Sequence, residues 1–161
     1  MNDNEESSGE VSIEKPGKIR WEVKSEGKLQ ILNGKKLIHV HIPKRRKGNV
    51  VDIYQNISKE LDTQSLSFLS GTDEFKSNYV LNIIKNSEKV VEVKLIPKNA
   101  TASSTYIAEF DKASYLLRSL STESADSTVR TEFSDIRINV FFDPEVFDYK
   151  PGPKDVVTVT K

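Results

Sequence analysis

Alternation of apolar and charged residues is the feature that most constrains this chain. In the segment Lys18–Lys24, the residues Ile19, Trp21 and Val23 are apolar, and all four alternate positions are charged. Successive side chains of a β-strand point to opposite faces, so this spacing predicts a strand with one buried face. Looser alternation predicts further strands at Leu29–Leu32, Leu37–Ile42, Val50–Tyr54, Tyr79–Ile84, Val90–Ile96, Thr105–Phe110, Tyr115–Ser121 and Val129–Val140.

Short polar connections separate these predicted strands. Asn33-Gly34 is the strongest turn signal, because both residue types tolerate the positive φ of a tight hairpin. Ser25–Gly27, Asn86–Glu88 and Asp111–Ser114 have the composition of further hairpin loops. Loops this short join neighbouring strands only in antiparallel order, so we expect an antiparallel meander.

The segment Ile57–Leu69 breaks the alternation. Its apolar residues Ile57, Leu61, Phe68 and Leu69, with Leu66 beside them, fall near helical spacing. Ser58 is a suitable N-cap residue and Gly71 a suitable terminator. We therefore expect one short amphipathic helix or helical turn that lies across one face or the mouth of the sheet.

Composition limits the functional classes. The 161 residues carry 24 basic and 24 acidic side chains, whereas a nucleic-acid-binding protein needs a net basic face. Apolar runs such as Ile138–Phe142 are far shorter than the ~20 residues of a membrane-spanning helix. The chain has no cysteine, which excludes disulfides and thiolate sites. Residues 1–9 are polar and lack the features of a secretory signal, so we expect a cytosolic protein or one whose signal has been removed.

Catalytic motifs are scarce. The only two histidines, His39 and His41, stand at positions that share one face of a strand, a spacing that two metal ligands use. The sequence offers no evident third ligand, so a solvent-facing polar edge is the favoured interpretation. No nucleophile elbow, phosphate-binding glycine loop or zinc-protease helix motif is present. We expect no enzymatic activity and no cofactor.

The run Lys44–Lys47 consists of four consecutive cations. Such a run suits an acidic partner surface or lipid headgroups, but it is also typical of a solvated hairpin tip that discourages strand pairing. No stacking aromatic residue flanks it, and we favour the solvated tip.

The apolar residues of the predicted strands are compatible with two structures. A meander of eight to ten strands curls, and its concave face is filled by side chains, by a helix or by a ligand. One alternative is a fully packed small barrel. The other is an apolar cavity for acyl chains, in which each buried methylene contributes about 0.8 kcal/mol.

Several sequence blocks together resemble the outer-membrane lipoprotein carrier family of Gram-negative bacteria. The blocks are Gly9–Glu22, Ile31–Leu37, Leu95–Lys98, Thr131–Asn139, Asp143–Phe147 and Lys150–Pro153. The resemblance implies a mainly β fold with a helical lid, built as an incomplete, strongly curved antiparallel β-barrel or half-barrel around a hydrophobic cavity. It further implies a periplasmic carrier that accepts acylated lipoproteins from an inner-membrane ABC transporter and delivers them to an outer-membrane receptor.

The resemblance also assigns expected roles to residues. The cavity is expected to be lined by Val11, Ile13, Ile19, Trp21, Val23, Ile31, Leu61, Leu66, Phe68, Leu69 and Phe133. Lys15 occupies the position of an arginine that contacts the lid, and lysine lacks arginine's planar fork of donors. We expect residues 1–8 to be a disordered or non-native tail and residues 9–161 to form a single domain. The family's N-terminal helix and first strand would precede Gly9.

Alternative functions remain open at this point. A domain of the same fold serves as an envelope sensor or receptor that binds a protein partner or a lipid. The membrane-anchored receptor of the same pathway would carry a lipidated N-terminal cysteine, which this chain lacks. An enzyme that uses His39 and His41 is the least favoured alternative.

Overall fold

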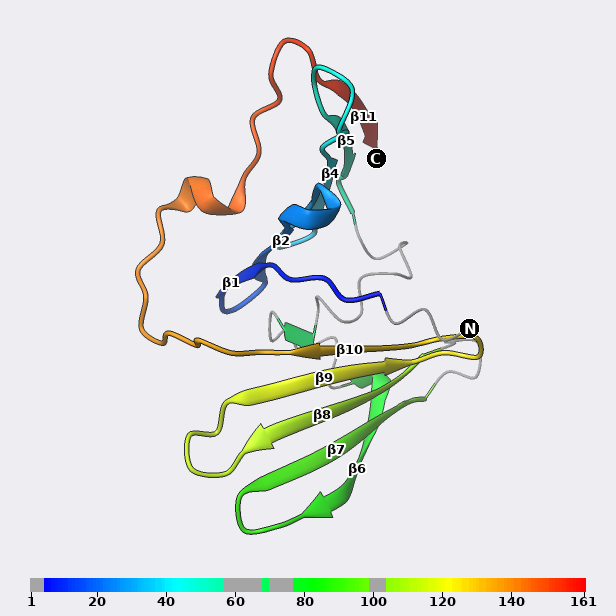
Figure 1. The fold of residues 1–161 in the computed structure, drawn as a ribbon, viewed down its shortest axis with the longest axis vertical. Coiled ribbons are helices and arrows are strands. Elements are labelled where there is room, and N and C mark those ends of the chain that lie inside the picture. Colours follow the sequence, from blue (N-terminus) through cyan, green and yellow to red (C-terminus); the bar gives the residue numbers. More distant parts are fainter. Residues whose placement is uncertain (1–4, 57–67, 70–76, 99–103) are drawn as a thin grey trace. The chain divides into compact units, whose positions relative to one another are not determined.

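The computed structural model describes residues 5–56, 68–69, 77–98 and 104–161. The chain forms two compact units (Figure 1). Unit 1 comprises Met1–Thr72 and Phe141–Lys161, and unit 2 comprises Asp73–Val140. Residues 5–9 have no regular secondary structure. The single domain expected over residues 9–161 stays a prediction.

Unit 1 contains a six-stranded sheet in the order β1-β2-β3-β4-β5-β11. Its strands are β1 (Glu10–Glu14), β2 (Lys18–Val23), β3 (Lys28–Asn33), β4 (Lys36–His41), β5 (Val50–Tyr54) and β11 (Val156–Thr160). The first five strands pair antiparallel, as short hairpins require. β11 pairs with β5 in parallel, which corrects the expectation of a purely antiparallel sheet. The chain between β5 and β11 is about a hundred residues long, so no short hairpin fixes the direction of β11.

The hairpin turns of unit 1 follow the sequence signals. Gly34 adopts a positive φ of 62° in the β3–β4 turn, while Asn33 remains in β3 and pairs with Lys36. The β2–β3 connection is the 3₁₀ turn η1 (Lys24–Glu26), which ends at Gly27 with a φ of 61°. Glycine adopts this left-handed conformation without steric strain.

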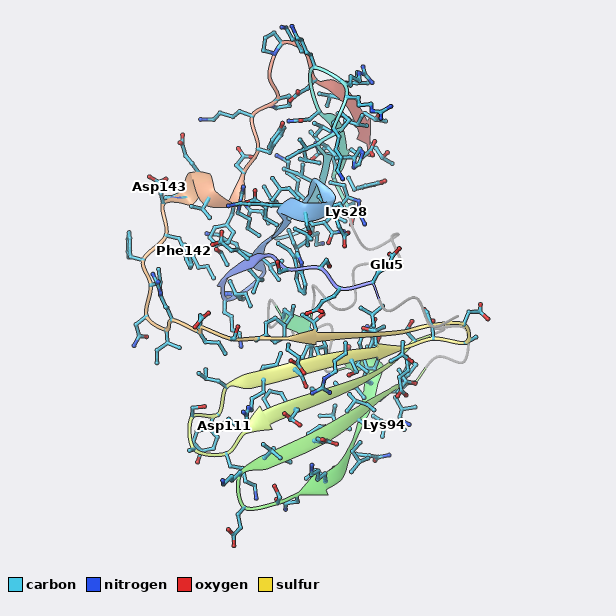
Figure 2. All side chains as sticks on the ribbon, viewed as in Figure 1. Glu5, Lys28, Lys94, Asp111, Phe142 and Asp143 are labelled. Atoms are coloured by element: carbon cyan, nitrogen blue, oxygen red, sulfur yellow. The ribbon has the colours of Figure 1, made fainter. Side chains whose placement is uncertain are left out.

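The sheet of unit 1 buries apolar side chains on both faces: Ile19, Leu32 and Leu37 are buried on one face, and a cluster around Phe147 is buried on the other. On this second face, Leu29, Ile31, Ile38, Val40 and Val51 are buried around Phe147 of the 3₁₀ helix η4 (Pro144–Phe147). Phe142, labelled in Figure 2, meets Phe147 edge to face with ring centroids 5.5 Å apart. The Asn33 amide Nδ2 donates to the Phe147 carbonyl at 3.2 Å. The C-terminal segment therefore covers this second face of the sheet from its own unit.

Unit 2 contains a five-stranded antiparallel meander in the order β10-β9-β8-β7-β6. Its strands are β6 (Tyr79–Asn86), β7 (Val90–Pro97), β8 (Thr105–Asp111), β9 (Leu117–Glu123) and β10 (Thr128–Glu132). The β8–β9 turn is held by the Asp111 carboxylate, which accepts hydrogen bonds from the backbone N–H groups of Ala113 and Ser114. These bonds lower the pKa of Asp111 below its usual range, with the Ser114 backbone bond the largest cause.

The mainly β prediction is confirmed. Within the described residues, each sheet has two free edges and neither closes into a barrel. The predicted strand Val129–Val140 is wrong beyond Glu132, because Asp135 and Asn139 adopt positive φ angles of 52° and 58° that interrupt an extended chain. Most of the predicted helix Ile57–Leu69 lies outside the described residues, as do Leu61 and Leu66. In the part of the chain that the structure describes, no helix has the length and apolarity needed to cross a membrane.

Candidate functional site

Five of the predicted cavity residues share one face of β1 and β2. The register opposes Val11 to Trp21 and Ile13 to Ile19, so these side chains project to the same side, together with Val23. Ile19 is buried, and the other four are half-buried. We call this set Val11, Ile13, Ile19, Trp21 and Val23 the β1–β2 face.

Ile31 stands apart from this set. The register pairs Ile31 with Arg20, whereas the neighbouring Leu32 pairs with Ile19. Ile31 therefore projects to the opposite face, where it is fully buried in the core around Phe147. The β2–β3 register thus separates Ile31 from Ile19 and Trp21, because β3 carries apolar residues on both faces. The expected place of Ile31 in the cavity stays a prediction.

A polar row crosses the sheet on the same side as Trp21. Gln30 opposes Trp21, His39 opposes Gln30, and Asp52 opposes His39. The Gln30 Nε2 and His39 Nε2 atoms lie 3.3 Å apart, and the His39 ring meets Tyr54 edge to face at 5.6 Å. Among the described residues, no three His, Cys, Asp or Glu side chains gather in a way that would hold a metal ion.

Unit 2 presents a broader apolar face. The register places Leu81, Ile83, Val93, Leu95, Tyr106, Ala108, Leu120 and Val129 on one side of the meander. The opposite side carries Asn82, Glu92, Glu109, Arg130 and Lys94, the last of which is labelled in Figure 2. We call the apolar set the β6–β10 face.

Exposure divides the β6–β10 face. Leu95, Tyr106, Ala108 and Leu120 are buried at its centre, whereas Leu81, Ile83 and Val129 are 60%, 67% and 59% exposed on its outer strands. Sequence reasoning did not single out these three, although the alternation in Tyr79–Ile84 put Leu81 and Ile83 on one face. An apolar side of a sheet normally packs on a core, so large exposed side chains in such a row are informative.

Two tyrosines and the threonines Thr122 and Thr131 place hydroxyl groups on this side of the sheet. The rings of Tyr79 and Tyr106 meet edge to face with centroids 5.9 Å apart. Burial raises the pKa of Tyr79 to about 12, and the nearby Tyr106 hydroxyl contributes further. The Tyr79 phenol therefore stays neutral at physiological pH.

The remaining predicted residues are scattered. Phe68 is half-buried and Leu69 is buried, but most of their predicted helix lies outside the described residues. Phe133 follows β10 and is half-buried, and its backbone N–H donates to the Arg118 carbonyl at 2.8 Å. Lys15 is exposed in the β1–β2 turn. Its expected lid contact involves segments that the structure does not describe.

Comparisons with known proteins identify relatives of this chain. The family model described as outer membrane lipoprotein carrier protein LolA matches residues 1–150. The chain is similar to outer-membrane lipoprotein carrier proteins from three bacteria. The Chromobacterium violaceum protein is 29% identical over 97% of this chain and 73% of its own length. The Dechloromonas aromatica and Methylococcus capsulatus proteins are 25% and 23% identical, each over 91% of this chain and 69% of its own length.

The matched region contains every described strand except β11, and it includes both apolar faces. The match therefore covers most of the chain and does not rest on one short motif. The chain belongs to the outer-membrane lipoprotein carrier family.

Proposed function

We propose that this protein carries acylated lipoproteins through the periplasm, from an inner-membrane ABC transporter to an outer-membrane receptor. The observation that carries the proposal is the β6–β10 face, on which Leu81, Ile83 and Val129 remain exposed beside a buried apolar centre. Membership of the lipoprotein carrier family supports the same role.

The exposed row suits an acyl chain because of its chemistry. Hydrocarbon gains about 25 cal/mol for each Å² of apolar surface removed from water, without any need for directional bonds. A long acyl chain that lies along β6 would cover Leu81 and Ile83, which stand two residues apart on the same side of that strand.

The β1–β2 face is proposed as a second acyl-binding surface. Val11, Ile13, Trp21 and Val23 are half-buried and form a continuous apolar patch over two paired strands. Phe68, Leu69 and Phe133 stay proposed contacts, as do Leu61 and Leu66 outside the described residues. Lys15 stays the proposed contact of a lid. Transfer to a receptor needs no energy at the carrier if the receptor binds the acyl chains more tightly.

A double substitution tests the acyl-binding role of the β6–β10 face. Leu81→Ser with Ile83→Ser removes the two most exposed apolar side chains of β6. We expect at least about tenfold weaker binding of a fluorescent acyl probe, since each lost methylene contact contributes about 0.8 kcal/mol. Displacement of the probe by a purified triacylated lipoprotein links the probe to the cargo.

The matched control lies on the other side of the same strands. Val80 and Ile96 oppose each other across β6 and β7 and are also exposed, but they project away from Leu81 and Ile83. Val80→Ser with Ile96→Ser should leave probe binding unchanged. Equal loss of binding in both double variants, or in neither, contradicts the proposed use of this face.

A further inference from the structure

The loop between β4 and β5 carries the strongest concentration of positive charge in unit 1. Lys44, Arg45, Arg46 and Lys47 are consecutive and all exposed. Among the residues that the structure describes, none of the four forms an ion pair or a side-chain hydrogen bond. We call these four residues the basic loop. Their charges are therefore available to an external anion.

The base of the basic loop is fixed to the C-terminal segment. The Asn49 backbone N–H donates to Asp155 Oδ1 at 2.7 Å, and the Asn49 Nδ2 donates to the Tyr149 hydroxyl at 2.7 Å. The Val156 N–H donates to the Asn49 carbonyl at 2.9 Å. Gly48 has a φ of 93°, and the backbone of Lys154 packs directly against it. These contacts hold the backbone at the base of the basic loop in place. The four charged side chains of the loop form no comparable contacts with the described residues.

Apolar surface and further cations adjoin the basic loop. A shallow hollow at its base is lined by Lys24, Lys28, Ile42 and Pro43, among others. Ile42, two residues before the basic loop, is 44% exposed. Lys28, labelled in Figure 2, is neutralised by Glu26 at 2.6 Å. The surface thus combines an uncompensated positive charge with an exposed aliphatic side chain.

The other acidic group of the hollow is also engaged. Glu22 lines the hollow and pairs with Arg20 at 3.3 Å. The hydrogen bond from Lys28 is the largest cause that lowers the pKa of Glu26, so this carboxylate is ionised and committed to its partner at neutral pH. Neither carboxylate pairs with a member of the basic loop.

We propose that the basic loop, with Ile42 beside it, docks reversibly on the surface of a bilayer that contains anionic phospholipids. Each Lys or Arg near such a surface contributes about 1 kcal/mol, so four cations give only weak and reversible attachment. Ile42 and Pro43 supply the apolar contact that peripheral membrane segments make at the headgroup boundary. The proposal goes beyond acyl-chain binding and does not depend on it.

Charge chemistry favours a bilayer over the other anionic partners. A lipid surface presents diffuse and laterally mobile charge, which matches cations that no hydrogen bond holds in one geometry. A carboxylate site on a protein is matched best by arginine forks held in place, and two of the four cations are lysines. The balanced charge of the whole chain argues against a nucleic acid.

Vesicle co-sedimentation tests the proposal. The full chain is mixed with vesicles of phosphatidylcholine alone, or of phosphatidylcholine with phosphatidylglycerol. We expect binding only to the anionic vesicles, and we expect it to fall steeply between 50 mM and 500 mM salt because surface charges are screened beyond about 10 Å at 0.1 M. This salt dependence uses the unmodified protein and needs no variant to fold.

Two quadruple variants show whether vesicle binding depends on the position of the four cations or only on the net charge of the chain. Replacing the basic loop by glutamine (K44Q, R45Q, R46Q, K47Q) should weaken anionic vesicle binding by at least about 100-fold, at about fivefold per cation. The variant K35Q, K89Q, K94Q, K112Q loses the same charge from other sites and should keep most of the binding. Ile42→Ser should weaken binding less than the loss of the loop.

Three outcomes of the vesicle experiments overturn the proposal. They are an absence of binding to anionic vesicles, equal binding to neutral vesicles, and equal loss in the two quadruple variants. Capture of an acidic protein without vesicle binding also overturns it, and it would assign the basic loop to a protein partner. Acyl-probe binding should be intact in the loop variant, which keeps this test distinct from that of the β6–β10 face.

Discussion

The two sheets of this protein differ in how far their apolar faces are covered by other parts of the chain. In unit 1, the C-terminal segment returns to the sheet and places Phe147 among Leu29, Ile31 and Val51, so one face becomes a closed core. In unit 2, the chain makes a simple meander, and its apolar face leaves Leu81, Ile83 and Val129 more than half exposed. The C-terminal segment stabilises the sheet of unit 1 by covering one of its faces. The sheet of unit 2 leaves part of its apolar face exposed to solvent.

From this difference we infer that the covered face of unit 1 contributes to stability, whereas the β6–β10 face is the proposed binding surface. A covered face contributes to the free energy of folding, and a ligand cannot use it. An uncovered apolar face contributes less to folding and remains available for a hydrophobic guest. We therefore expect substitutions in the Phe147 core to affect stability, and substitutions on the β6–β10 face to affect binding.

The largest expected effect comes from Phe147→Ala. Phe147 is 1% exposed and central to the unit 1 core, so its truncation should lower the free energy of unfolding by about 3–5 kcal/mol. The counterpart on the open sheet is Ile83→Ala, which should change stability by no more than about 0.5 kcal/mol. Urea denaturation of both variants measures the contrast, and similar losses would remove the distinction between the two faces.

Alanine substitutions at two glycines test whether the C-terminal segment packs against the base of the basic loop. Gly34 and Gly48 both have positive φ, so replacement by alanine strains the backbone at either site by about 1–2 kcal/mol. At Gly48 a new methyl group also collides with the Lys154 carbonyl, whereas at Gly34 it meets open space. Gly48→Ala should therefore be the more destabilising by at least about 1 kcal/mol. Equal thermal shifts would mean that the segment does not hold this position in solution.

A smaller effect is expected from the amide that ties β3 to the C-terminal segment. Asn33→Ala removes the hydrogen bond to the Phe147 carbonyl and should cost about 0.5–1.5 kcal/mol. Asn86 ends β6 of the open sheet, is exposed, and provides the matched control. Asn86→Ala should lie within about 0.5 kcal/mol of the unmodified chain by denaturation. A larger loss of stability in Asn86→Ala than in Asn33→Ala would contradict a stabilising role of the Asn33 hydrogen bond.

The smallest effect is a pH dependence at Asp155. Hydrogen bonds from the Asn49 backbone, then from the Gly152 backbone and the Tyr149 hydroxyl, lower the pKa of this carboxylate. A lowered folded pKa means that the stabilisation is present above the unfolded value of about 3.9 and is lost as pH falls through the folded value. Asp155→Asn should flatten the loss of stability below about pH 4. Denaturation at pH 3 to 7 measures the free energy of unfolding of both proteins. If this free energy falls equally with pH in Asp155→Asn and in the unmodified chain, Asp155 does not cause the dependence.

Sequence reasoning located most of the strands because the signals are local. The alternation around Trp21 and the turn residue Gly34 act within a few positions, so β2 and the β3–β4 hairpin follow from them. The same reasoning failed at residues 133–140, where a strand-like pattern does not form a strand. Asp135 and Asn139 tolerate positive φ, and alternation alone does not reveal that they use it.

The candidate site was only partly predictable for a related reason. Alternation shows that Ile19, Trp21 and Val23 share a face, and the structure agrees. It does not show which face of β3 joins them, and only the β2–β3 register places Ile31 on the opposite face. The exposed pair Leu81 and Ile83 was missed because exposure depends on what covers a strand, and no strand records that in its own sequence.

By itself, the sequence determined a mainly β protein with short hairpins, and the comparisons agree with the family that its sequence blocks resemble. Those properties depend on residues that are near neighbours along the chain. Only the tertiary structure decided the parallel pairing of β11 with β5, the burial of Phe147 against β3 and the fixed base of the basic loop. These contacts join residues about a hundred positions apart, and their partners are selected by packing and register, not by local pattern.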